Sequence, residues 1–148
     1  MPLDEYKKMR DFTKSPEPEG GFKKKTGNIF VVHEHDASHL HYDLRLEMGG
    51  VLRSWAVPKE PPEKEGVKRL AIQTEDHPLE YADFEGTIPE GMYGAGAVRI
   101  WDRGEFRLEE EKGDRLLFEL KGKKLRGNYA LIKTKFKGKD SWLLFKRM

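Results

Sequence analysis

The chain has 148 residues, of which 36% are hydrophobic and 36% are charged, and this length suits one domain with one core. It contains no cysteine, which excludes disulfides, thiolate zinc sites and thiol nucleophiles, so any metal must be bound through nitrogen and oxygen. No stretch approaches the roughly 18 consecutive apolar residues of a membrane span, and the N-terminus lacks an apolar signal core, so we expect a cytoplasmic protein without a membrane contact.

Charge is distributed unevenly along the chain, although the net charge is only +2. Residues 119–148 carry ten Lys and Arg against two acidic residues, whereas residues 26–118 carry eleven basic and nineteen acidic residues. A basic C-terminal segment beside an acidic middle indicates a contact with a polyanion. The alternative is a lysine-rich face that is simply solvated, and charge alone does not distinguish the two.

The elements expected in chain order begin with an irregular N-terminal arm, residues 1–26, in which LDEYKKMRDF can form about two helical turns before SPEPEGG breaks the helix. Short β-branched or alternating segments follow: NIFVVH, LHYDLRLE, VLRSWAV, RLAIQTE, AVRIW, GEFRLEE, RLLFELKG, NYALIKTKF and SWLLFKR. Turn residues separate them, in MGG, KEPPEKEG, GTIPEGMYGAG, DRG, EKGD, RGN and KGKD. Strands at this spacing predict a mainly β fold, an antiparallel barrel or sandwich, in a single domain of residues 1–148.

Histidine is concentrated in one short stretch, because four of the five histidines lie within residues 33–41. On a strand, side chains two positions apart share a face, and LHYDLRLE alternates strictly. The apolar set is expected to face the core: Leu40, Tyr42, Leu44 and Leu46. The polar set is expected on the opposite face: His41, Asp43, Arg45 and Glu47. These polar side chains form either a salt-bridge ladder or a functional site.

The preceding HEHDASH favours a metal site, because imidazole and carboxylate are ordinary ligands of divalent transition metals. Asp-Ala-Ser is prone to form a turn, which could bring His35 towards His41 and Asp43. The residues alone leave open whether the third ligand is His33, His35 or His39.

The neighbouring Arg45 indicates what such a metal would act on. A metal site needs no guanidinium, whereas a phosphate is well matched by the rigid donor fork of arginine. A metal beside an arginine therefore indicates phosphoryl chemistry. The fifth histidine, His77 in EDHPLEY, is held extended by Pro78, with Tyr81 four residues on, and it could contact the phosphate or donate a proton. The alternative is a histidine in a surface loop.

Two other families of metal site fit part of the pattern. GNIFVVHEH opens like a cupin motif, but the later glutamate and histidine ligands of that motif are missing. His41-Tyr42-Asp43 fits the His-x-Asp of iron oxygenases that use two histidines and one carboxylate, with His77 as the only downstream histidine. Those enzymes need a basic residue about one strand beyond that histidine, whereas the next one here, Arg99, is 22 positions away.

The motif HDASHLHYDLRLE, followed by GGVLRSWAVPK, EDHPLEYADFEGTIPEGMYGAGAVRIWDRG, LRGNYALIK and WLLFKR, resembles the 3′-phosphoesterase domain of LigD-type bacterial DNA repair ligases and its stand-alone archaeal and bacterial forms. The resemblance covers nearly the whole chain, from RDFTKSPEP to the end. It implies a small antiparallel β-barrel with short flanking helical elements, and a manganese-dependent enzyme that heals 3′ ends in end joining. Such enzymes remove a terminal ribonucleoside, leaving a 3′-phosphate, and then hydrolyse that phosphate to a 3′-OH.

The resemblance also assigns roles to single residues. It implies that Mn²⁺ is bound by His35, His41 and Asp43, with His33 and His39 as neighbours of the ligands. It implies that the substrate phosphate is contacted by Arg45 and His77, supported by Tyr81.

Further residues of the family pattern lie outside the histidine cluster. Asp11 and Glu17 match functional acidic residues in the RDF-x-x-x-PEP segment, which is expected to pack near the active site. Lys59 of AVPK and Arg69 of KRLAI match basic, phosphate-binding residues around it. The partners implied are primer–template 3′ ends and a separately encoded ligase and polymerase, and we expect a monomer. A non-catalytic module that binds DNA ends is the alternative function, since the basic residues 121–147 would serve it equally well.

Overall fold

The computed structural model describes residues 3–20, 27–135, 138 and 140–148. Two short helices and nine strands make up these residues: α1 (Asp4–Lys8), β1 (Ile29–Asp36), β2 (Leu40–Met48), β3 (Val51–Val57), β4 (Lys68–His77), the 3₁₀ helix η1 (Leu79–Asp83), β5 (Gly86–Ile88), β6 (Gly96–Lys112), β7 (Arg115–Lys121), β8 (Arg126–Lys133) and β9 (Ser141–Lys146). Among them, no helix is long and apolar enough to cross a membrane.

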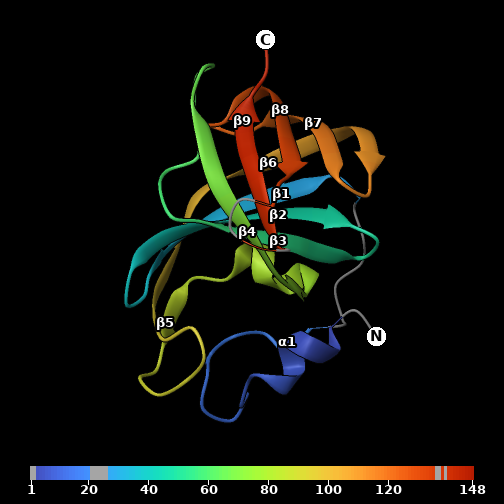
Figure 1. Cartoon of the computed structure of the whole chain (residues 1–148). Coiled ribbons are helices and arrows are strands. Elements are labelled where there is room, and N and C mark those ends of the chain that lie inside the picture. Colours follow the sequence, from blue (N-terminus) through green and yellow to red (C-terminus); the bar gives the residue numbers. More distant parts are fainter. Residues whose placement is uncertain (1–2, 21–26, 136–137, 139) are drawn as a thin grey trace.

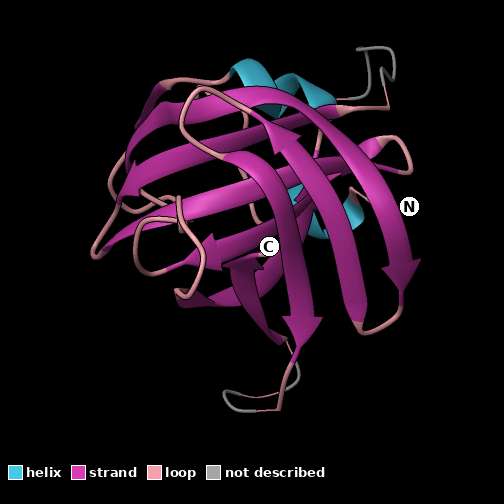
Figure 2. Ribbon diagram, turned by 90° about the horizontal axis from the view of Figure 1, so that it is seen from above, coloured by secondary structure: helices cyan, strands magenta, loops and turns pink. Residues whose placement is uncertain are grey.

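Eight of the strands close into an antiparallel barrel, which confirms the predicted fold class (Figures 1 and 2). The order is β1-β2-β3-β4-β9-β8-β7-β6, and pairing of β1 with β6 closes the ring. Tight hairpins join neighbouring strands, as at Gly49 and Gly50, whose positive φ angles of 65° and 84° suit the turn between β2 and β3. The short strand β5 pairs with the first residues of β6, outside this ring.

The barrel interior is filled by one face of each strand. Its large, fully buried residues include Trp55 and Trp142, whose rings meet edge to face at 5.9 Å. On β2 the inward residues are Tyr42, Leu44 and Leu46, as the alternation predicts. The same alternation was wrong for Leu40, which is 48% exposed because it is the first residue of the strand.

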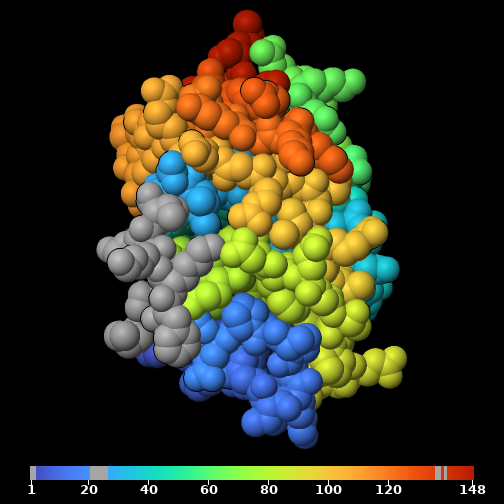
Figure 3. All heavy atoms as spheres, turned by 180° about the vertical axis from the view of Figure 1, so that it is seen from behind, coloured from blue at the N-terminus to red at the C-terminus, as the bar shows by residue number. Residues whose placement is uncertain are grey.

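A second apolar layer lies outside the barrel wall. It packs the N-terminal arm, η1 and β5 against the outer faces of β1, β3 and β6, and its buried members are Tyr6, Val31, Leu52, Leu79, Tyr81, Ala82, Phe84, Ile88 and Val98. Seen from behind, the arm covers one end of the molecule, next to the segment that contains η1 and β5 (Figure 3). This layer turns the outer face of the β1–β2 hairpin into a buried surface.

Three further sequence expectations about elements were wrong. RGN does not form a turn, because its three residues begin strand β8. DRG does not form a turn either, because β6 runs unbroken through it. Asp102 instead accepts hydrogen bonds from the backbone N–H groups of residues 123–125, and Gly104 lies so close to β7 that a Cβ atom would come within 2.3 Å of the Lys121 carbonyl oxygen. These two residues therefore serve strand packing rather than chain reversal. The helix of the arm is also shorter than expected, five residues in α1.

Candidate active site

The β1–β2 hairpin places the polar residues of the histidine stretch on one outer face of the barrel. The strands pair so that His35 lies opposite His41, His33 opposite Asp43, and Val31 opposite Arg45. A turn at residues 37–39 reverses the chain, which confirms the expected approach of His35 to His41 and Asp43.

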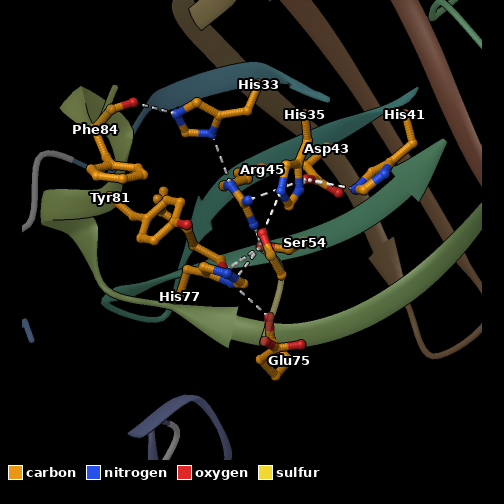
Figure 4. Close-up of polar contacts among 12 residues, drawn as sticks. His33, His35, His41, Asp43, Arg45, Ser54, Glu75, His77, Tyr81 and Phe84 are labelled. Carbon is orange, nitrogen blue, oxygen red and sulfur yellow. Dashed lines mark hydrogen bonds and ion pairs between the residues drawn. The ribbon is translucent and has the colours of Figure 1, made fainter. Parts of the chain in front are cut away.

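One ligand atom from each of His35, His41 and Asp43 lies within 4.8 Å of the others. His35 Nδ1 is 3.6 Å and His41 Nε2 is 3.2 Å from Asp43 Oδ2 (Figure 4). The other nitrogen of each ring donates to a backbone carbonyl, that of His35 to Gly94 at 2.7 Å and that of His41 to His39 at 3.2 Å. Both rings thus have their free nitrogen directed at the carboxylate, an arrangement typical of histidines that bind a metal.

Charge in this cluster is concentrated on Asp43. Burial alone would raise the pKa of its carboxyl, but the contacts from His35 and His41 and the nearby Arg45 guanidinium lower that pKa well below its ordinary value. For His41, burial lowers the pKa, yet the neighbouring carboxylate outweighs it and the net shift is upward. The pocket therefore holds an ionised carboxylate that attracts either a proton on His41 or a cation.

Arg45 is buried and fixed by three polar contacts. Its Nε donates to His33 Nδ1 at 3.1 Å, its Nη1 to Ser54 Oγ at 2.9 Å, and its Nη2 approaches Asp43 Oδ2 at 3.4 Å. His33 in turn donates from Nε2 to the Phe84 carbonyl at 3.0 Å. Burial and the Arg45 charge lower the pKa of His33 to about 3, so this ring is a neutral hydrogen-bond acceptor for the guanidinium.

His77 reaches the same pocket through an irregularity in β4. The register between β3 and β4 shifts between Leu52 and Ser54, so that His77, not Asp76, lies opposite Leu52. Its Nδ1 donates to the Glu75 carbonyl at 2.9 Å, and its Nε2 accepts from an Arg10 nitrogen at 3.4 Å. Burial, with Arg45 and Arg10 nearby, lowers the pKa of His77 well below its ordinary value, so the ring is neutral.

The N-terminal arm supplies the remaining wall. Glu17 accepts hydrogen bonds from Arg10 at 3.0 Å and from the Tyr81 hydroxyl at 2.7 Å, and Arg10 also donates to Glu75 at 3.0 Å. All of these side chains, with those of the His-His-Asp cluster, line one pocket of about 250 Å³. The pocket thus combines a candidate site for one metal ion with two guanidinium groups. Together, a metal ion and guanidinium donors could bind the oxygens of a phosphate group.

Comparison with protein families gives this arrangement a context. The family model of the DNA ligase D 3′-phosphoesterase domain matches residues 33–133. The chain belongs to this 3′-phosphoesterase family.

Relatives of this chain include much longer proteins. The multifunctional non-homologous end joining protein LigD of Pseudomonas aeruginosa is 54% identical over 155 residues, which cover 98% of this chain and 18% of that protein. The corresponding DNA repair protein of Mycobacterium tuberculosis is 51% identical over 147 residues, which cover 95% of this chain and 19% of that protein. The chain therefore spans about a fifth of the length of these relatives.

Seven of the expected site residues line this pocket, and three lie outside it. The pocket contains His35, His41, Asp43, Arg45, His77, Tyr81 and Glu17, as expected, and also Arg10. Asp11 does not line it, because its carboxylate accepts from the Thr13 backbone and hydroxyl in a local turn. Lys59 is an exposed loop residue, and Arg69 donates to the Glu60 carbonyl at 2.9 Å. Neither of these two basic side chains lines the pocket.

Sequence reasoning missed Arg10, Glu75 and the role of His33. His33 could have been found, because it shares strand parity with His35 and therefore the same face. Arg10 and Glu75 carry no comparable signal, since an arginine just after a short polar helix and a glutamate near a strand end are ordinarily surface residues. Only the packing of the arm onto β4 brings the two together.

Proposed function

We propose that this chain is a Mn²⁺-dependent phosphoesterase that heals DNA 3′ ends, removing a terminal ribonucleoside and then the 3′-phosphate that remains. Family membership supports a role in the repair of DNA ends, and hydrolysis of phosphoric esters is the class of reaction that fits the family. The observation that carries the proposal is the convergence of His35, His41 and Asp43 with Arg45 and His77 in one pocket.

The cluster fits a divalent metal on its own chemistry. One imidazole nitrogen from each histidine and one ionised carboxylate oxygen converge, and the opposite nitrogen of each ring is held by a carbonyl. His35, His41 and Asp43 would hold the ion, and the choice of manganese rests on the family. When bound there, a divalent ion supplies Lewis-acid polarisation of a phosphoryl oxygen.

The chain's own residues would bind the other oxygens. Arg45 presents a guanidinium whose position is set by His33 and Ser54, so it needs little reorganisation to stabilise charge that develops on the phosphate. His77 is neutral, and its Nε2 accepts from Arg10. A bound phosphate would lower the local positive potential and favour protonation of this ring, which could then bind the phosphate as a donor. The buried Tyr81 hydroxyl, bonded to Glu17, supports this wall.

The proposed partners are primer–template 3′ ends that carry a ribonucleotide or a 3′-phosphate, and a ligase or polymerase that would use the healed 3′-OH. The direct test is incubation of the protein with an end-labelled primer–template of each kind, with Mn²⁺ or with EDTA. We expect Mn²⁺-dependent shortening of the ribonucleotide end by one nucleoside and conversion of the 3′-phosphate to a 3′-OH. A His35→Ala variant is the control for a contaminating enzyme. Tight binding of the ends without any conversion would instead support a non-catalytic end-binding module.

A further inference from the structure

Tyr93 is an aromatic side chain at the mouth of the pocket that none of the roles above uses. It is 50% exposed, and in residues 3–20, 27–135, 138 and 140–148 it is the only exposed aromatic residue. It nevertheless lines the same pocket as His35, Asp43, Arg45 and His77. Exposing a large aromatic ring beside a phosphate-binding site suits a ligand that has both a phosphate and a flat ring.

We propose that Tyr93 is a stacking platform for the nucleobase next to the bound phosphate, so that the site binds a nucleotide rather than a phosphate alone. This inference rests on the proposed function. Both proposed substrates share one nucleotide, the one whose 3′ oxygen carries the phosphate. The base of that nucleotide is the occupant, because a platform that serves both reactions must contact the part that both substrates contain.

The loop that carries Tyr93 is built rigidly and tied to the cluster. Two successive turns form it, with Met92 N bonded to the Pro89 carbonyl at 3.2 Å and Ala95 N to the Met92 carbonyl at 3.1 Å. Gly94, at a φ of 76°, occupies the position of the second turn that favours glycine, and its carbonyl accepts the His35 ring N–H. The turn that presents Tyr93 therefore also orients a candidate metal ligand, which fixes the ring relative to the phosphate.

The Tyr93 ring is also supported from the protein side. The Arg10 guanidinium lies 5.2 Å from the ring centroid, within cation–π range. Arg10 is itself held by Glu17 and Glu75 at 3.0 Å each, so this support does not move freely. A ring held from the protein side and half exposed to solvent is preorganised for stacking, since little side-chain entropy remains to be lost.

A second hollow, of about 500 Å³, adjoins the pocket and has different chemistry. Thr74, Glu75 and Tyr93 line both. The rest of its lining is Glu5, Met9, Gln73, Asp76 and Asp140. Its carboxylates would repel a second phosphate, but carboxylate and amide oxygens can accept from the amino groups of a base, while Tyr93 and the partly exposed Met9 offer apolar surface. This contrast favours a base in the second hollow and a phosphate in the first.

The test combines a protein change with a substrate change. Tyr93→Ala, Tyr93→Phe and wild-type protein are compared on a 3′-phosphate primer–template whose terminal nucleotide is either intact or abasic, under single-turnover conditions with Mn²⁺. On the intact end, we expect Tyr93→Ala to raise the half-saturating protein concentration about 5- to 150-fold, the range for losing one base–aromatic stack. Tyr93→Phe keeps the ring and should stay near wild type. On the abasic end, wild type and Tyr93→Ala should agree.

The control variant is Leu108→Ala, which removes an exposed apolar side chain at a site away from both hollows. Equal half-saturation for wild type and Tyr93→Ala on the intact end would overturn the inference. An equal loss on intact and abasic ends would also overturn it, because the tyrosine would then act only through the loop and His35. A terminal 2-aminopurine, whose fluorescence falls on stacking, separates this question from catalysis. If the wild type converts neither end, the proposed function fails, while quenching by wild type but not by Tyr93→Ala would still support the platform.

Discussion

The two faces of strand β2 are both buried, but different parts of the chain bury them. The inner face, Tyr42 and Leu44 among others, packs on the other strands of the barrel. The outer face, with Asp43 and Arg45, is covered by the N-terminal arm, η1 and the loop before β6. A charged group can be buried in this way only where hydrogen-bond partners are supplied, and here they come from segments far apart in sequence.

This difference has a consequence for substitutions. On the inner face a side chain contributes mainly through its volume, whereas on the outer face it contributes through the specific polar contacts that it makes. Each variant of the outer face should therefore lose the property that depends on the contacts of the replaced residue, either metal binding or reaction rate. Replacement of a candidate metal ligand should cause the greatest loss.

The greatest loss is expected at His41. His41→Ala removes one candidate ligand nitrogen, so Mn²⁺ occupancy should fall and single-turnover cleavage should drop to background. The matched control is His39→Ala. His39 is exposed and holds His41 only through its backbone carbonyl, which alanine retains, so this variant should keep most activity and most metal. Near-normal turnover in His41→Ala would exclude the proposed metal site.

A large but different loss is expected at Arg45. Arg45→Ala should retain Mn²⁺, because a guanidinium is not a metal ligand, and should lose about 10²–10³ in rate, as for removal of a donor aimed at developing charge. Arg45→Lys should recover little, since an ammonium cannot reproduce the hydrogen bonds to His33 and Ser54 together. Metal content and single-turnover rate are measured on the same preparation. Loss of both together would mean that Arg45 only braces Asp43.

A smaller loss is expected at His33, which is fully buried but is not in the His-His-Asp cluster. His33→Ala leaves the Arg45 Nε without its acceptor, and a displaced guanidinium should cost up to about 10² in rate with metal retained. His33→Asn can place an amide oxygen near the former Nδ1 position and should recover part of the rate. In the double variant with Arg45→Ala, His33→Ala should add little further loss, because it acts through Arg45. Full additivity would show that His33 acts independently.

These variants also mark how far the sequence could predict the site. Alternation in LHYDLRLE was enough to place His41, Asp43 and Arg45 on one face, because strand parity is a local property. The turn-prone DAS allowed His35 to approach them, but only the family resemblance selected His35 over His33 and His39. Strand spacing predicted a barrel or a sandwich, and the family resemblance selected the barrel. The residue pattern alone could not place His77 in the pocket, since its position depends on a register shift in β4 that no such pattern marks, and its assignment came from the family resemblance. Nor could Arg10, whose role depends on how the arm packs against Glu75.

The structure leaves three of the single charged residues expected at the site outside the pocket, and their roles stay predictions. Asp11, Lys59 and Arg69 all have local or solvent-exposed surroundings, because a lone charged residue in a loop or at a strand end finds backbone or water partners close by. The basic C-terminal segment was treated in the same way, as a surface for DNA. Several of its charges have internal partners, since Arg147 pairs with Glu109 and Lys146 donates to the Glu63 carbonyl. Lys137 and Lys139 lie outside the described residues.

The weakest effect is therefore expected at Lys133 and Lys135, exposed residues that end β8 and begin the turn to β9. That turn leads to Asp140, which lines the hollow beside the pocket, so DNA bound there would pass close to both lysines. Replacing both with Gln should weaken binding to duplex ends and reduce the slope of log K against log salt by about 0.9 for each DNA phosphate that is no longer neutralised.

Lys64→Gln is the matched control. It removes one charge from the exposed loop that meets the opposite end of β9, where Lys146 donates to Glu63, and it should leave the slope unchanged. Binding is measured at several salt concentrations. An unchanged slope for the double variant would show that these lysines are only solvated, and the DNA backbone would then be held by the arginines of the pocket alone.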